Sequence, residues 1–176
     1  MKKILVLTLT LALALGMCAS AQATTYLALG TGGTSGTYYA LGADIAALWM
    51  ANIADLDVTV QPTDASKDNI VFIEDGEIDL ATVQNDAMAY AYEGNEFYGG
   101  EVFNGFYAIG TLYPEAVQCV VAADSDILTI ADLKGKNVSV GAQGSGTYMN
   151  AEQVLACAGL TMDDINPQYL SFSESA

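Results

Sequence analysis

The sequence predicts an α/β fold with largely parallel sheets. Segments with strand character alternate with segments in which apolar residues recur at helical spacing, and this order is typical of parallel strands joined by crossover helices. A strand, a glycine-rich turn and a helix start also follow one another twice, at residues 27–38 and 138–148. A hydrophobic fraction of 52% with 15% charged residues indicates a folded chain rather than a disordered one.

The N-terminal segment has the features of a secretory signal peptide. Two lysines precede an apolar run at residues 4–15, and small residues then permit cleavage after Ala21 or Ala23. We therefore assign residues 1–23 to a cleaved signal. A membrane anchor is the alternative, but the apolar run is shorter than the about 20 residues that a bilayer requires.

The signal places the mature protein outside the cytoplasm. A lipid anchor at Cys18 is disfavoured because the preceding Met17 is bulky where such sites need a small residue. Cys119 and Cys157 would then remain, and an exported compartment permits a disulfide between them. Both lie among apolar residues, so we expect two buried, unpaired thiols, although a disulfide stays open.

Residues 24–113 are expected to form a first lobe. A strand at 26–30 leads into the glycine-rich segment 30–36, and residues 37–52 carry apolar side chains at helical spacing. The other elements expected in this lobe are a strand at 57–61 before Pro62, a helix at 66–75, a strand at 78–83 after the Gly76 turn, a short helix at 85–92, and a strand at 106–112.

Residues 114–176 are expected to form part of a second lobe. Its elements are a strand at 116–122, a helical turn at 130–133, a strand at 137–140, a helix at 147–158 ended by Gly159, and a strand at 168–170. After this last strand the sequence resembles a helix N-cap with no helix behind it. We therefore expect the second lobe to be incomplete in this sequence.

The charge composition excludes several classes of protein. The chain has 21 acidic residues against 5 lysines, with no arginine or histidine, and its formal charge is −16. Without the signal segment, 21 acids face 3 lysines, a charge of −18. Nucleic-acid binding needs basic side chains against phosphates, so it is excluded. Histidine catalysis and an arginine clamp on an anion are excluded with it.

The repeated strand–glycine–helix unit is the most informative local feature. Both copies end in Ser-Gly-Thr-Tyr, at residues 35–38 and 145–148. Glycine lets the backbone approach a ligand closely, and a helix start presents unpaired N–H groups to an anion such as a carboxylate. Neither copy has the third glycine of a dinucleotide site or the lysine of a P-loop. Two matching copies favour facing half-sites on two lobes.

A set of motifs occurs in order along the mature chain, at residues 30–39, 76–86, 112–115, 132–136 and 140–147. Together these motifs resemble the TAXI proteins, the extracytoplasmic solute-binding subunits of tripartite ATP-independent periplasmic (TRAP) transporters. The resemblance implies a type 2 periplasmic-binding-protein fold, with two lobes that close on a small organic acid or amino acid. It also implies integral-membrane TRAP subunits as partners, and no cofactor. Gln143 departs from the proline that the family often has there.

Without arginine, a carboxylate must be held by backbone N–H groups, hydroxyls and amides. Lys134 and Lys136 flank a turn and are expected to be solvated surface charges. Lys67 is a weaker candidate for holding the carboxylate than these groups, because a lysine at a helix start is usually exposed. Gln84 and Asn85 follow a strand end, where α/β sheets place ligands. The candidate ligand-binding residues are Thr31, Gly33, Thr34, Gly36, Tyr38, Gln84, Asn85, Gln143, Ser145, Gly146 and Thr147.

Two other functions remain as alternatives. One is a binding module of the same fold that serves a sensor or an ATP-driven importer. The other is a secreted enzyme with a catalytic carboxylate pair, although no acidic pair stands beside a motif that would orient a substrate. The pairs Asp124/Asp126 and Asp163/Asp164 lack calcium-loop spacing, so neither a metal site nor catalysis is expected.

Overall fold

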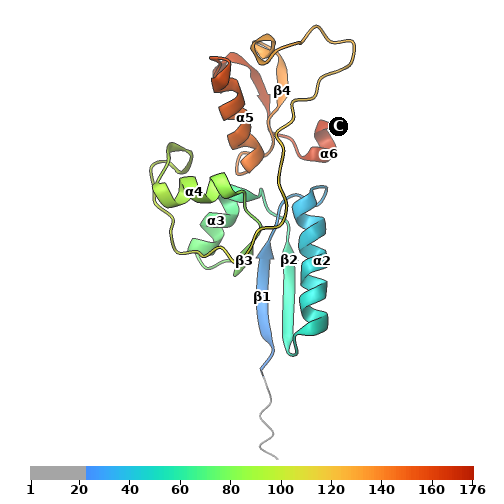
Figure 1. Ribbon diagram of the computed structural model, residues 1–176, viewed down its shortest axis with the longest axis vertical. Helices are drawn as coiled ribbons and strands as arrows, with labels where there is room; N and C mark the ends of the chain where they lie inside the picture. Colours follow the sequence, from blue (N-terminus) through green and yellow to red (C-terminus); the bar gives the residue numbers. More distant parts are fainter. Residues whose placement is uncertain (1–22) are drawn as a thin grey trace, which may run out of the picture.

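The computed structural model describes residues 23–176, which form two α/β units, one above the other in Figure 1. The signal peptide assigned to residues 1–23 therefore lies outside the described residues except for Ala23. No helix of the described part is long and apolar enough to cross a bilayer. The elements of the first unit are β1 (Thr25–Gly30), α2 (Thr37–Asn52), β2 (Leu56–Gln61), α3 (Ser66–Glu74), β3 (Leu80–Ala81), α4 (Asn85–Glu93) and the 3₁₀ turn η1 (Glu96–Tyr98).

The second unit is smaller and follows a long extended segment. Its elements are the 3₁₀ turn η2 (Ile130–Leu133), β4 (Asn137–Ser139), α5 (Gly146–Cys157), the 3₁₀ turn η3 (Met162–Asp164), β5 (Asn166–Gln168) and the single turn α6 (Phe172–Ser175). Gly159 follows α5 with a φ of 70°, a left-handed conformation that ends the helix as expected.

Both sheets are parallel, which confirms the expected α/β class. The first has the order β2-β1-β3, and β1 pairs with β2 along its whole length. The second sheet consists of β4 and β5, paired in parallel from Asn137 opposite Asn166. Because parallel strands end at the same edge of a sheet, the loops after β1, β2 and β3 meet at one edge, the edge that faces the second unit in Figure 1.

Three apolar clusters hold these elements in place. Leu29 and Val58 of the first sheet are buried against Ala46 of α2. Ile70 of α3 is buried with Ala91 and Tyr98 beside it. Figure 1 shows α2 on one side of this sheet and α3 with α4 on the other, as the alternation of strands and helices predicts. The second unit has its own core of Leu133, Val140, Leu155, Leu160 and Ile165.

One buried amide joins the strand ends of the first sheet. Asn69 of α3 has no exposed surface. Its Nδ2 donates to the carbonyl oxygens of Thr31 after β1, at 2.7 Å, and of Thr82 after β3, at 2.9 Å. Its Oδ1 accepts from the hydroxyl of Thr63 after β2, at 2.7 Å. A single side chain therefore satisfies groups from all three loops that leave the sheet.

Two expected strands are absent from the described chain. Residues 106–112 and 116–122 have strand-like sequences, but the structure has no strand there and residues 107–122 are all exposed. A strand needs a neighbour to receive its backbone hydrogen bonds, and no strand of the described residues pairs with this segment. Propensity alone was therefore a poor guide at this segment.

Other expectations also need correction. The strand expected at residues 78–83 is shorter than expected. It is reduced to β3, because only Leu80 and Ala81 pair with β1. Cys119 and Cys157 are free and exposed rather than buried. Cys119 lies in the exposed segment 107–122. Cys157 ends α5, whose buried side chains include Leu155 instead.

The Asn69 bonds predict a large stability effect. We expect Asn69→Leu to lower the free energy of unfolding by about 2 kcal/mol, because leucine keeps the approximate volume but leaves the buried Thr82 carbonyl unpaired, at about 1–3 kcal/mol. The Thr31 carbonyl keeps its hydrogen bond from the Thr63 hydroxyl, at 3.0 Å. Urea denaturation of the full-length protein measures the loss. The same change at the exposed Asn52, at the end of α2, is the control; equal losses at both positions would contradict the prediction.

Candidate functional site

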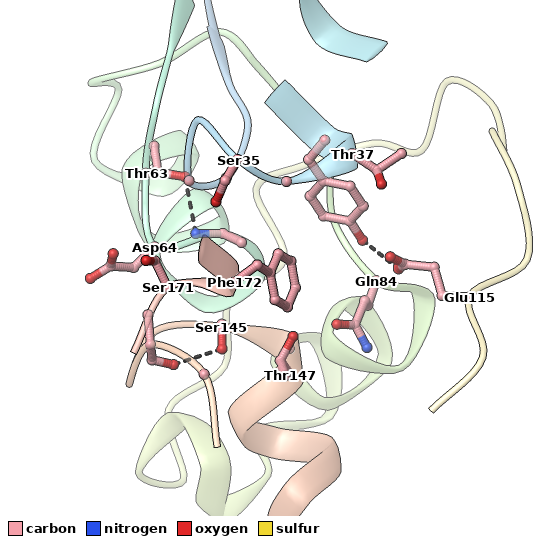
Figure 2. A pocket seen from close by; sticks show the side chains of 18 of the residues that line it. Ser35, Thr37, Thr63, Asp64, Gln84, Glu115, Ser145, Thr147, Ser171 and Phe172 are labelled. Atoms are coloured by element: carbon pink, nitrogen blue, oxygen red, sulfur yellow. Dashed lines mark hydrogen bonds between the residues drawn. The ribbon is translucent and has the colours of Figure 1, made fainter. Parts of the chain in front are cut away.

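A cavity of about 640 Å³ lies between the two units and is lined by both glycine-rich turns. Figure 2 shows side chains that converge on it from the start of α2, from the loops after β2 and β3, and from α5 and α6. Its volume is in the range of small-molecule sites. The two copies of the repeated sequence unit thus line one cavity, as expected for facing half-sites on two lobes.

The start of α2 lies at this cavity without a side-chain cap. Gly36 precedes the helix in an extended conformation and provides no side-chain cap, and the first turn has no acidic residue. The N–H of Gly36 donates a hydrogen bond to the carbonyl of Gly33, at 2.8 Å. The N–H groups of the first turn have no partners within the helix, so their partial positive charge is available to a ligand.

The start of α5 differs because its serine is already engaged. The Ser145 hydroxyl accepts from the N–H of Tyr148 at 3.0 Å and donates to the carbonyl of Ala142 at 2.6 Å. This is an N-cap that uses both hydrogen-bonding directions of the hydroxyl. Gly141 has a φ of 83°, and a methyl group there would meet Ser145 and Thr147 at 2.9 Å. The second turn is therefore tightly packed, while the first is open.

A tyrosine and a carboxylate meet at the mouth of the cavity. The hydroxyl of Tyr38 donates to Glu115 at 2.6 Å, a bond drawn in Figure 2. The Tyr113 hydroxyl lies 3.4 Å from the other carboxylate oxygen. Burial raises the pKa of Tyr38 far above its ordinary value, and the charge of Glu115 raises it further. Tyr38 is therefore a neutral hydrogen-bond donor to Glu115.

Polar contacts join the two units beside the cavity. Gln84 Nε2 donates to Asn150 Oδ1 of α5 at 2.8 Å, and Asn150 Nδ2 donates to Asp86 of α4 at 3.0 Å. Farther along α5, Gln153 donates to the hydroxyl of Tyr90 at 3.1 Å. A methyl group at Gly146 would overlap the Gln84 amide, so this helix start packs directly against the first unit.

The structure brings most of the predicted ligand residues to the cavity. Those that line it are Gly33, Gly36, Tyr38, Gln84, Gln143, Ser145, Gly146 and Thr147. Thr31, Thr34 and Asn85 are not among the lining residues. Thr31 is fully buried and donates to the carbonyl of Gln61 at 2.7 Å, and Asn85 faces a neighbouring cavity along the exposed segment.

Sequence reasoning missed several residues that line the cavity. They are Ser35, Thr37, Thr63, Asp64, Tyr113, Glu115, Tyr169, Ser171 and Phe172. Tyr113 and Glu115 belong to a motif that carries the family resemblance, so a signal for them was present. Nothing in the sequence indicated Phe172, whose ring comes within 3.5 Å of a methyl position on Gly36.

No metal-binding group is formed by the part of the chain that the structure describes, where no three Cys, Asp or Glu side chains gather closely enough. The lysines at residues 67, 134 and 136 lie away from the cavity. Lys134 pairs with Asp164 at 2.9 Å and Lys136 lies 3.8 Å from Asp126, both largely solvated as expected. Lys67 lies 5.1 Å above the ring of Phe97. The cavity is therefore lined by polar, acidic and aromatic side chains without a lysine.

Comparison with known proteins agrees with this geometry. The chain is similar to the alkanesulfonate-binding protein SsuA from Xanthomonas axonopodis pv. citri bound to MOPS, with 25% identity and a TM-score of 0.57, over 88% of this chain and 50% of that one. It has the same fold as the periplasmic aliphatic sulphonate binding protein SsuA from Escherichia coli, with 24% identity and a TM-score of 0.52, over 85% of this chain and 48% of that one. It thus spans about half the length of these binding proteins. Residues 29–176 match the model of the NMT1-like family, and the chain belongs to that family.

Proposed function

We propose that this chain belongs to an extracytoplasmic solute receptor, which captures a small carboxylate-bearing solute between its two lobes. The observation that carries this proposal is the cavity of about 640 Å³ that both glycine-rich turns line. The open start of α2 would hold the carboxylate through backbone N–H groups. The Tyr38 ring and the Gln84 and Thr147 side chains would surround the rest of the solute.

The similarity to periplasmic binding proteins supports a receptor rather than an enzyme and supports a periplasmic location. We further propose that the receptor delivers its solute to the membrane subunits of a TRAP transporter. That assignment rests on the TAXI-like motifs at residues 30–39 and 140–147, which line the cavity in part. Alkanesulfonates, for which the similar solved proteins are named, are a second candidate solute class.

The contacts between the units suggest how capture would be stabilised. Asn150, Gln153 and Gly146 lie on one helix and meet Gln84, Asp86 and Tyr90 of the first unit. Such contacts form only when the lobes are close, so they would favour a closed state that encloses the solute. Binding would then draw on the free energy of these contacts as well as on contacts to the solute.

The proposal predicts reversible binding without chemistry. Calorimetry on the full-length protein, with a panel of dicarboxylates, amino acids and alkanesulfonates, should find a ligand that binds with one-to-one stoichiometry. Mass spectrometry of the recovered ligand should show it unchanged. Turnover of any bound ligand would contradict the receptor assignment.

The role of the α2 start predicts an effect of Thr37→Pro. Proline is tolerated at the first helical position, and Gly36 already has the extended backbone that a following proline needs. The variant therefore removes one N–H group and should keep its urea midpoint. We expect about fivefold to tenfold weaker binding of a carboxylate ligand from the panel. Thr37→Val keeps the N–H and is the control; equal weakening in both would assign the effect to the hydroxyl.

Closure predicts an effect of Asn150→Ala, although Asn150 does not line the cavity. The change removes the bonds to Gln84 and Asp86, so we expect about fivefold weaker binding and a smaller ligand-induced decrease in the radius of gyration by X-ray scattering. Asn52→Ala, at the far end of α2, should leave both quantities unchanged. Unaltered affinity in Asn150→Ala would show that these bonds do not stabilise the bound state.

A further inference from the structure

The charges around the cavity are all negative. Its lining includes the carboxylates of Asp64, Glu115 and Glu174 and no lysine. Glu174 is held in place locally, since its carboxylate accepts from the hydroxyl and the N–H of Ser171 at 2.6 and 3.0 Å. The lysines of the described residues are engaged elsewhere, with Phe97, Asp164 and Asp126. A purely anionic solute would thus meet three carboxylates and no cationic side chain.

Glu115 lines the cavity at the hydroxyl ends of two tyrosines. Tyr38 donates to one of its oxygens, and Tyr113 approaches the other. The two rings lie edge to face, with centroids 6.4 Å apart and planes at 70°. Both hydroxyls are neutral donors, because burial raises the pKa of each and the charge of Glu115 adds to the rise. The Glu115 carboxylate is thus held by two tyrosine hydroxyls in the lining of the cavity.

Aromatic side chains continue around the same space. Tyr169 and Phe172 of the second unit line the cavity together with Tyr38 and Tyr113. The Phe172 ring packs against Gly36 at the start of α2, and Figure 2 shows it projecting into the space between the glycine turn and Thr147. Aromatic faces next to a carboxylate are the groups that bind an organic ammonium, through cation–π attraction and a charged hydrogen bond.

On these grounds, and resting on the proposed receptor function, we infer that the solute carries a protonated nitrogen and that Glu115 determines this specificity. The carboxylate of the solute lies at the start of α2, where N–H groups are open, and its ammonium lies against Glu115 among the rings of Tyr38, Tyr113 and Phe172. Tyr38 belongs to the first turn of α2, so both charges of a zwitterion are met within one turn of helix. A nitrogen-free alkanesulfonate such as ethanesulfonate, or a dicarboxylate, has no group that uses Glu115.

Calorimetry with matched ligand pairs tests this inference. The full-length protein is titrated with leucine and 4-methylpentanoate, with 4-aminobutanoate and butanoate, with phenylalanine and 3-phenylpropanoate, and with ethanesulfonate. We expect at least one amine-bearing acid to bind more than tenfold tighter than its partner without nitrogen. Glu115→Gln keeps an oxygen acceptor for Tyr38 and removes the charge, so it should reduce that preference to less than about threefold. Glu101→Gln, outside the cavity lining, should preserve it.

The outcomes separate this inference from the receptor assignment. Tighter binding of ethanesulfonate or of the nitrogen-free acids, or an unchanged preference in Glu115→Gln, would overturn the inference and leave the receptor function standing. Binding of no ligand in the panel, or conversion of a bound ligand, would count against the receptor function and the inference together. Circular dichroism spectra identical to the parent's confirm that the glutamine variants are folded.

Discussion

The buried Asn69 side chain is the interaction on which the arrangement of the site depends. The sheet has three strands, and the loops that follow them lie side by side. The carbonyl groups of Thr31 and Thr82 in these loops accept hydrogen bonds from a side chain and not from a neighbouring strand. Asn69 donates to both of these carbonyls and accepts from the loop after β2. Because an unpaired buried carbonyl is costly, this one amide fixes how the three loops lie relative to one another. The loop after β1 contains the first glycine turn, the loop after β2 contains Thr63, and the loop after β3 contains Gln84; all three line the cavity.

Around this fixed edge, the two glycine turns have taken different roles. The first leaves the N–H groups of α2 open, and the second uses Ser145 to cap α5 and packs Gly146 against Gln84. One turn therefore suits ligand binding, and the other suits contact between the units. Sequence similarity between the copies could not show this difference, because it depends on which groups of the opposite unit lie nearby. With no arginine or histidine in the chain, the open turn is the natural place for a negative group.

Local patterns predicted most of the helices and the parallel pairing. The helix at residues 37–52 was predicted with its observed bounds, because its apolar spacing and the glycine before it act locally. The segments at residues 106–112 and 116–122 were predicted as strands and are not, since strand formation needs a partner that propensity does not supply. Cys119 was expected to be buried because its sequence neighbours are apolar, and it is exposed together with that segment.

For the site, the sequence by itself determined the chemistry that was available: two helix starts after glycine turns, hydroxyls, amides and carboxylates, and no arginine or histidine. It also marked eight of the residues that line the cavity, because they follow strand ends where parallel sheets place their ligands. The tertiary structure alone decided that Glu115 meets Tyr38, 77 positions apart, and that Asn150 meets Gln84, 66 positions apart. Such pairs arise from the packing of whole elements, and no local spacing specifies them.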